Sequence, residues 1–188
     1  MTELFQHTTP PKAFFPWKTI AIAVTALALA GFVLVHLTWH RTNADVTITQ
    51  VKLYPSHIVF KHTFGIVGRD QTEDDMYVIA TIAVKSNVPA PLSIDGITGV
   101  LTLADGSTLN ATAVEKSELP NLFTSFPAVK TLAGPPLYRE TIIAPGATVD
   151  GTIILHYPVD QKTWDARKSS TISVTPYHQP ALTVELPK

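Results

Sequence analysis

Residues 19–39, with the sequence TIAIAVTALALAGFVLVHLTW, form a stretch of 21 residues that contains no charged side chain. No other stretch of this length in the chain lacks a charge. As a helix with a rise of about 1.5 Å per residue, it would be about 30 Å long, close to the thickness of the hydrocarbon core of a bilayer. The sequence therefore predicts a transmembrane helix over residues 18–40, after an N-terminal tail at residues 1–17.

Two interpretations of this stretch stay open, a retained signal anchor and a cleaved signal peptide. The alternating alanines of residues 26–30 resemble a signal peptidase site. The apolar run continues through residues 31–35, beyond that site, so we expect a retained anchor. Lys18 directly precedes the stretch and favours a cytoplasmic tail. The preference for this orientation is small, because Lys and Arg are nearly balanced on the two flanks.

Residues 44–188 are 145 residues long, which is an ordinary size for one domain. The chain has no cysteine, so the domain has no disulfide and no cysteine to carry a lipid. This region contains 11 Lys and Arg against 14 Asp and Glu, a net charge of −3. Because a nucleic-acid surface needs clustered positive charge, we expect no nucleic-acid partner.

Apolar and polar residues alternate along several segments of this region. In residues 76–84 every even-numbered position is apolar, namely Met76, Val78, Ala80, Ile82 and Val84. Successive side chains of a strand point to opposite faces, so this pattern predicts a strand with one face on a core. The alternation in residues 46–53 changes phase near Gln50, which predicts a β-bulge. Residues 57–60 are expected to continue the same edge.

Turn residues separate the predicted strands. Asp105-Gly106 lies between residues 100–103 and 108–114 and predicts a hairpin, because this pair tolerates the positive φ angles of a tight turn. Pro145-Gly146 precedes a strand over residues 149–157. Two more strands are predicted at residues 171–175 and 181–186. Short strands at this spacing predict an all-β fold, an antiparallel β-sandwich of seven to nine strands.

One or two short helical turns are expected between the strands. Residues 117–126 contain Ser117 as a possible cap and Pro120, and we interpret them as a helical turn in a long crossover. Residues 160–168 begin with Asp160 as N-cap and end with basic residues, which suits the helix dipole. We expect about two helical turns there, with Trp164 as the buried anchor.

The densest charge in the chain lies at residues 69–75. Carboxylates there are weak candidates for a Ca²⁺ site, because this ion prefers oxygen ligands: Asp70, Glu73, Asp74 and Asp75. The order of an EF-hand loop and its glycine are missing, so a solvated loop is the favoured interpretation. The histidines show no metal-ligand spacing and no nucleophile motif is present. We therefore predict no catalytic residue, no metal and no cofactor.

An apolar, proline-containing segment at residues 132–139 follows several aromatic residues. If this crossover is exposed, it forms a partner-binding surface, because large exposed apolar patches usually mark interaction sites. If it folds back, it caps an open end of the sandwich. The residues that we predict to contact a partner are Phe123, Phe126, Leu137, Tyr138 and Trp164.

Three segments carry a resemblance to a known class of domain. They are residues 77–87 followed by 89–92, residues 103–106, and residues 143–151. With these turns the region resembles the immunoglobulin-like (telokin-like) extracytoplasmic domains of bacterial membrane-anchored proteins of unknown function. The resemblance implies an envelope location and roles in binding or assembly, and it supplies no catalytic residues. Many such proteins are lipoproteins, whereas this chain would use a helix.

From these features we expect a single-pass protein of the bacterial inner (cytoplasmic) membrane with a periplasmic C-terminal domain. The leading hypothesis is a non-enzymatic protein that contacts the lipid bilayer and binds a protein partner, or serves as an accessory or assembly subunit in the cell envelope. The alternatives are a ligand- or Ca²⁺-sensing domain and a hydrolase whose site is not visible in the sequence.

Overall fold

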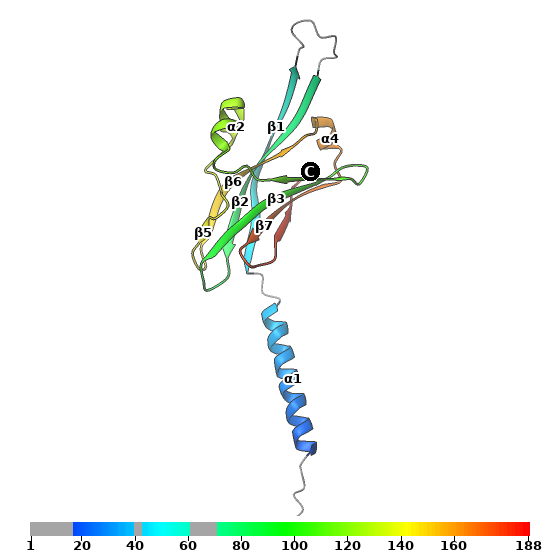
Figure 1. The fold of residues 1–188 in the computed structure, drawn as a ribbon, viewed down its shortest axis with the longest axis vertical. Helices are drawn as coiled ribbons and strands as arrows, with labels where there is room; N and C mark the ends of the chain where they lie inside the picture. Colours follow the sequence, from blue (N-terminus) through cyan, green and yellow to red (C-terminus); the bar gives the residue numbers. More distant parts are fainter. Residues whose placement is uncertain (1–16, 40–42, 61–70) are drawn as a thin grey trace, which may run out of the picture. The chain divides into compact units, whose positions relative to one another are not determined.

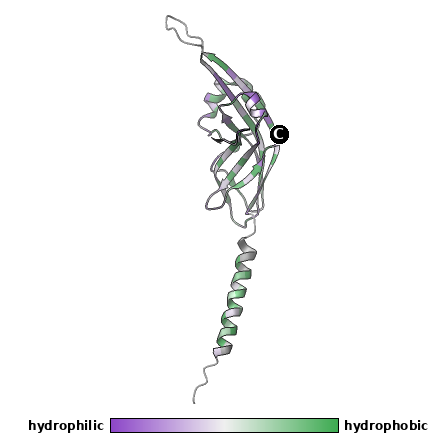
Figure 2. Ribbon diagram, turned by 90° about the vertical axis from the view of Figure 1, so that its right-hand side faces the viewer, coloured by the Kyte–Doolittle hydropathy of each residue, from purple (hydrophilic) through white to green (hydrophobic). Residues whose placement is uncertain are grey.

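A computed structural model describes residues 17–39, 43–60 and 71–188. The chain divides into two compact units, Met1–Arg41 and Thr42–Lys188. In the first unit, helix α1 runs over Trp17–Trp39 (Figure 1). Apolar side chains such as Ile22, Leu27 and Phe32 are exposed along α1, and Figure 2 shows its described part in hydrophobic colours. Among the residues that the structure describes, no helix meets the length and hydropathy expected of a membrane span.

The second unit contains two antiparallel sheets. The first sheet has the order β1-β2-β6, from β1 (Ala44–Phe60), β2 (Gln71–Ser86) and β6 (Thr148–Tyr157). The second has the order β4-β3-β7-β8, from β4 (Thr108–Thr112), β3 (Leu92–Thr102), β7 (Ser169–Pro176) and β8 (Leu182–Glu185). Strand β5 (Ile142–Ile143) also pairs with β3. These eight described strands confirm the predicted antiparallel β-sandwich (Figure 1).

The main core contains the side chains that alternate along β2. All five apolar even-numbered side chains from Met76 to Val84 are fully buried. They belong to one cluster with residues of the second sheet such as Leu101, Ile172 and Val174. Burying an aliphatic side chain of this size contributes about 1.5–3 kcal/mol. The period-two prediction for residues 76–84 is therefore confirmed.

The predicted bulge in β1 is present. The register between β1 and β2 shifts between Ile48 and Gln50, which leaves Thr49 as the extra residue. The Thr49 hydroxyl donates a hydrogen bond to the carbonyl of Thr81 at 3.0 Å. With this insertion both halves of the alternating pattern can face the core, and β1 continues as one strand to Phe60.

Two turns contain glycine in the left-handed region, as the sequence predicts for the Asp105-Gly106 turn. Gly106 has a φ of 94° between β3 and β4, and Gly146 has a φ of 69° before β6. Asp105 accepts hydrogen bonds from the amide and the hydroxyl of Ser107 at 2.8 and 2.7 Å. These bonds hold the pKa of the Asp105 carboxyl below its usual value. The side chain therefore stabilises the hairpin turn in its ionised form.

Three short helices join the strands, α2 (Leu119–Ser125), α3 (Pro127–Leu132) and α4 (Gln161–Asp165). The prediction that Ser117 caps α2 is wrong: the N-cap is Glu118, and no side chain caps it. Helix α3 lies beyond the predicted helical turn of residues 117–126 and begins at Pro127, directly after the non-helical Phe126.

Helix α4 confirms its predicted cap. The Asp160 carboxylate accepts a hydrogen bond from the amide of Thr163 at 2.7 Å, and this bond lowers the pKa of Asp160. Trp164 is 1% exposed, as expected of an anchor. The helix contains five residues, which is shorter than the two turns predicted.

Candidate functional site

The connection from β4 to β5, residues 113–141, is called the crossover below. Both of its ends bind the free edge of β6. The amide of Val114 donates to the carbonyl of Ile154 at 2.9 Å, and the amide of Leu137 donates to the carbonyl of Thr152 at 2.9 Å. The amide of Thr152 in turn donates to the carbonyl of Pro135 at 2.7 Å. The crossover therefore leaves the second sheet and closes the edge of the first.

Helices α2 and α3 of the crossover cover the outer face of the first sheet. A second apolar cluster forms there from Tyr77 and Ile79 of β2, Ile154 of β6, and Leu119 and Val129 of the two helices. The middle of β2, residues 76–80, is thus buried on both faces. Tyr77 and Ile79 are apolar residues at odd-numbered positions of the same stretch, and they are the signal in the sequence from which this second layer could be predicted.

Aromatic rings connect α2 and α3 to the sheet. The ring centroid of Phe126 lies 4.9 Å from that of Tyr77 and 6.3 Å from that of Tyr54. The His156 ring stacks on the Tyr77 ring, with 5.0 Å between the two ring centroids. Burial, together with the nearby Asp75 carboxylate, raises the pKa of Tyr77 to about 12. The contacts of Phe126 are therefore mainly internal.

The structure separates the five predicted contact residues into two groups. Leu137 and Trp164 are 4% and 1% exposed and belong to the main core, so the prediction that these two side chains contact a partner is wrong. Leu137 is buried because the crossover folds back onto β6. Phe123, Phe126 and Tyr138 are half-buried and pack at the second cluster. Only these three keep part of their surface available to a partner.

A groove of about 860 Å³ lies beside the crossover, where β3 changes its neighbour from β4 to β5. It is called the charged groove, and it is lined by residues 95–98, 112–117 and 137–141. Arg139 and Asp95 form an ion pair of 3.7 Å on this lining. Glu140 has a φ of 67°, and its amide donates to the carbonyl of Ile94 at 2.7 Å. This left-handed residue holds one wall of the groove against β3.

A second groove of about 320 Å³ lies between α2 and residues 133–138. It is called the apolar groove. Its lining is mainly apolar and includes Lys116 as the one charged residue: Val114, Lys116, Leu119, Pro120, Phe123, Ala133, Gly134, Pro136, Leu137, Tyr138, Thr152 and Ile154. Four residues, including Lys116 and Tyr138, line both grooves. The Lys116 ammonium lies 5.6 Å from the centre of the Tyr138 ring. The two grooves therefore adjoin at this pair.

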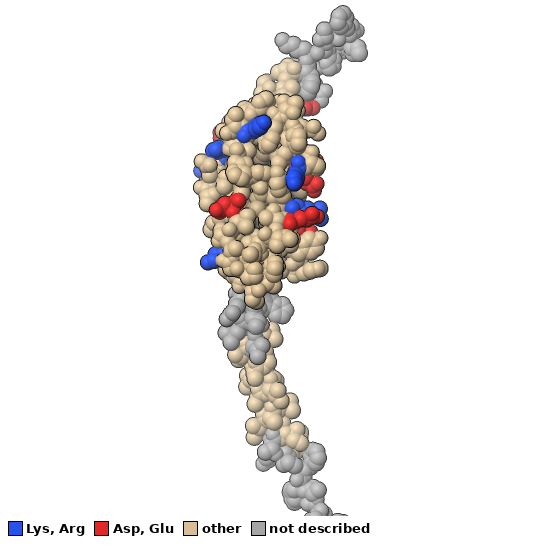
Figure 3. All heavy atoms as spheres, turned by 90° about the vertical axis from the view of Figure 1, so that its left-hand side faces the viewer, with Lys and Arg blue, Asp and Glu red and all other residues tan. Residues whose placement is uncertain are grey.

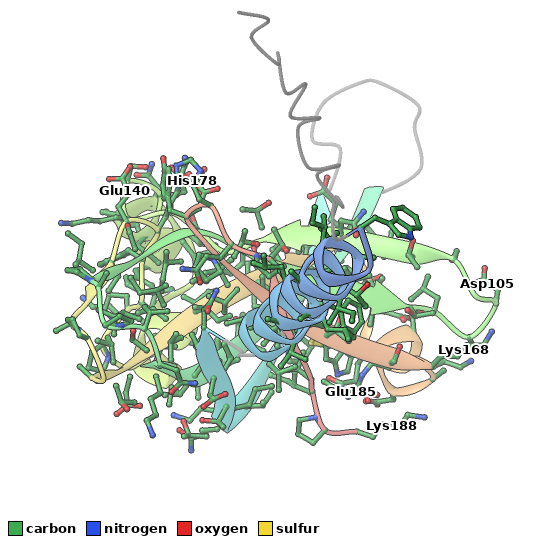
Figure 4. All side chains as sticks on the ribbon, turned by 90° about the horizontal axis from the view of Figure 1, so that it is seen from below. Asp105, Glu140, Lys168, His178, Glu185 and Lys188 are labelled. Carbon is green, nitrogen blue, oxygen red and sulfur yellow. The ribbon has the colours of Figure 1, made fainter. Side chains whose placement is uncertain are left out.

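Figures 3 and 4 show the domain from two further sides. The face on the side of α2 and β5 shows scattered charged side chains on a mostly uncharged surface (Figure 3). Figure 4 shows Glu140, on the lining of the charged groove, at the end of the domain opposite Asp105 and Lys168. The hairpin that contains Asp105 is therefore a suitable control region, far from this groove wall.

The acidic residues from Gln71 onward, which the structure describes, do not assemble as a cation site. The stretch predicted as a loop continues as β2 from Gln71, so consecutive carboxylates point to opposite faces. Asp74 lies 2.6 Å from Nδ1 of His57, and Asp75 lies 2.7 Å from Nε2 of His156. In the described part of the chain, Glu73, Asp74 and Asp75 join no group of three possible metal ligands. Asp70 lies outside the described residues.

No protein-family model matches the sequence, and no curated protein matches it. Solved structures show a distant likeness. The yjhA protein of Bacillus subtilis is 12% identical with a TM-score of 0.44, over 77% of this chain and 92% of that chain. An uncharacterized β-sandwich protein from Clostridium difficile 630 is 16% identical with a TM-score of 0.40, over 78% of this chain and 87% of that chain. At this identity the likeness concerns the β-sandwich fold alone.

Proposed function

We propose that this chain is a non-enzymatic, membrane-anchored protein whose immunoglobulin-like β-sandwich binds a protein partner in the bacterial cell envelope. The domain would act as an accessory or assembly subunit, and the crossover would supply the contact surface. The observation that supports this proposal is the pair of adjoining grooves, with Phe123 and Tyr138 on their lining. Two grooves that meet at the partly exposed Tyr138, with Phe123 on the lining of one of them, offer the anchoring pockets that protein interfaces use.

Anchoring in the inner membrane, with the domain in the periplasm, is the second part of the proposal. The uncharged residues 19–39 and the exposed apolar side chains of α1 support it. Extraction of cell membranes with alkaline carbonate tests it: the chain should stay with the lipid pellet. Recovery of the chain in the soluble fraction, at its full length, would contradict the anchoring.

The partner proposal is tested by recovering the full chain from native membranes in mild detergent and identifying what co-purifies. Pro120 is exposed on the apolar groove and lies in the first turn of α2, so Pro120→Glu alters the surface without emptying the core. A Phe123→Ser variant removes an aromatic side chain of the groove. Both variants should lose the partner, and an exposed control, Lys168→Gln, should keep it.

The melting temperature of each variant separates loss of binding from loss of folding. Pro120→Glu is expected to melt close to the natural chain, since its side chain is exposed. Equal partner recovery from Pro120→Glu, Phe123→Ser and the natural chain would reject the crossover as the contact surface.

A further inference from the structure

We infer that the apolar groove receives an apolar side chain of the partner that stands next to a carboxylate, and that the Lys116 ammonium binds this carboxylate. The inference rests on the proposed function and adds to it the chemical class of the partner segment. In this inference Lys116, which lines both grooves, favours apolar partner segments that carry a carboxylate over those that do not.

The walls of the apolar groove are fixed by buried residues. Leu119, Leu137 and Ile154 line it and are each less than 10% exposed. The amide of Gly134 donates to the Thr152 hydroxyl at 3.2 Å, which ties the crossover wall to β6. The volume of about 320 Å³ lies at the lower end of the roughly 300–1,000 Å³ typical of ligand pockets. The groove therefore suits one or two side chains, and it is formed before the partner arrives.

The Lys116 ammonium has acidic neighbours in sequence, Glu115 and Glu118, but forms no ion pair with them in the described structure. In the described part of the domain, the ion pairs are His57–Asp74, Arg139–Asp95 and His156–Asp75, and none includes Lys116. Its neighbour Glu118 instead accepts a hydrogen bond from the amide of Glu115 at 3.3 Å. An ammonium over a tyrosine ring at the mouth of an apolar groove is electrostatically complementary to an anion. The partner segment is therefore expected to carry an apolar side chain and a carboxylate on adjacent residues.

The charged groove favours a peptide over a free fatty acid as the occupant. It continues from Lys116 and Tyr138 past Glu115, Arg139 and Glu140, so side chains of both signs line the path beyond the apolar groove. An alkyl chain gains nothing from such a lining, whereas an extended peptide presents backbone and side-chain polar groups to it. A peptide in which an aromatic residue precedes an aspartate satisfies both grooves.

The test titrates the full chain in mild detergent with three acetylated and amidated hexapeptides, followed by NMR of the leucine methyl groups. The peptides have the sequences Ser-Gly-Phe-Asp-Gly-Ser, the same with Phe-Asn, and the same with Ser-Asp at the centre. The Phe-Asp peptide should shift the methyl signals of Leu119 and Leu137. The Phe-Asn peptide should bind roughly two- to five-fold more weakly, the range of a partly exposed ion pair. The Ser-Asp peptide should lose at least about ten-fold.

Substitution of Lys116 assigns the effect to one residue. In Lys116→Gln the Phe-Asp and Phe-Asn peptides should bind equally, while the matched control Lys168→Gln should keep their difference. Equal binding of the two peptides to the natural chain, a difference that survives in Lys116→Gln, or no shift of the two methyl signals overturns the inference. A stronger response to sodium hexanoate than to the Phe-Asp peptide also overturns it and assigns the groove to a fatty acid.

The two proposals fail separately. If Pro120→Glu abolishes recovery of the native partner while the Phe-Asp and Phe-Asn peptides bind equally, only the role of Lys116 is rejected. If Pro120→Glu leaves partner recovery unchanged, the contact surface itself is rejected, whatever the peptides do.

Discussion

Substitution of Gly151 by alanine probes the contact between the crossover and β6 directly. A Cβ atom at Gly151 would lie 2.6 Å from Cβ of Leu137 and 2.9 Å from its amide nitrogen, closer than van der Waals contact allows. The structure can respond in two ways. Overpacking with small shifts costs about 1–3 kcal/mol. Detachment of the segment loses two buried hydrogen bonds, at about 0.5–1.5 kcal/mol each, and the burial of Leu137, at about 1.5–3 kcal/mol.

The less costly response sets the outcome, so we expect Gly151→Ala to lower the free energy of unfolding by about 2 kcal/mol. For a domain of this size that corresponds to a fall in melting temperature of roughly 4–8 °C. The assay is thermal and urea unfolding of the full chain in mild detergent. Gly96→Ala is the matched control, because a Cβ there meets no atom within 4 Å. Its expected change is within about 0.5 kcal/mol. Equal stability of the two variants would refute the packing of the crossover against β6.

Three further predictions concern the core, the helix cap and the tyrosines. Trp164→Ala should lower the free energy of unfolding in urea by about 3–5 kcal/mol, because it empties a buried site and removes the ring that lies 4.4 Å from the Arg167 guanidinium. A loss below about 1 kcal/mol would contradict the role of Trp164 as an anchor. The pKa of Asp160 is lowered in the folded state, so its cap stabilises the domain above the ordinary carboxyl pKa and fails as the pH falls through the lowered value. Acid unfolding of Asp160→Asn should lack this dependence, and an unchanged acid profile would count against the cap. Burial raises the pKa of Tyr77 and of Tyr157 to about 12. Because these hydroxyls ionise more readily in the unfolded chain, the free energy of unfolding should fall as the pH rises from 10 to about 12. Tyrosinate absorbance that shows all tyrosines ionising together near pH 10 would refute their burial.

Local patterns in the sequence predicted the strands and turns well. The burial of the side chains from Met76 to Val84, the bulge at Thr49, the turn at Gly106 and the cap at Asp160 depend on residues that are neighbours in sequence. In each case one steric or hydrogen-bonding requirement of the backbone selects the residue type, such as glycine at a positive φ. Such requirements are visible without knowledge of the tertiary structure.

The crossover could not be predicted in the same way. Leu137 and Phe123 are both apolar residues of one irregular segment, yet Leu137 enters the main core and Phe123 lines a groove. Their environments depend on hydrogen bonds to Thr152 and Ile154 of β6, which are distant in sequence. The acidic residues show the same limit, because the continuation of β2 to Gln71 places Asp74 and Asp75 on opposite faces. Long-range pairing decides both outcomes, and composition does not encode it.

The most direct test of the central claim is site-specific photo-crosslinking in native membranes. A photoreactive residue replaces Phe123 on the apolar groove or Glu140 on the charged groove, and Thr183 of β8 is the control position. If the crossover binds a partner, both groove positions should capture the same protein, Thr183 should not, and an excess of the unlabelled natural chain should compete while unlabelled Pro120→Glu should not. Capture of that protein from all three positions alike, or competition by Pro120→Glu as effective as that by the natural chain, would contradict a partner site at the crossover.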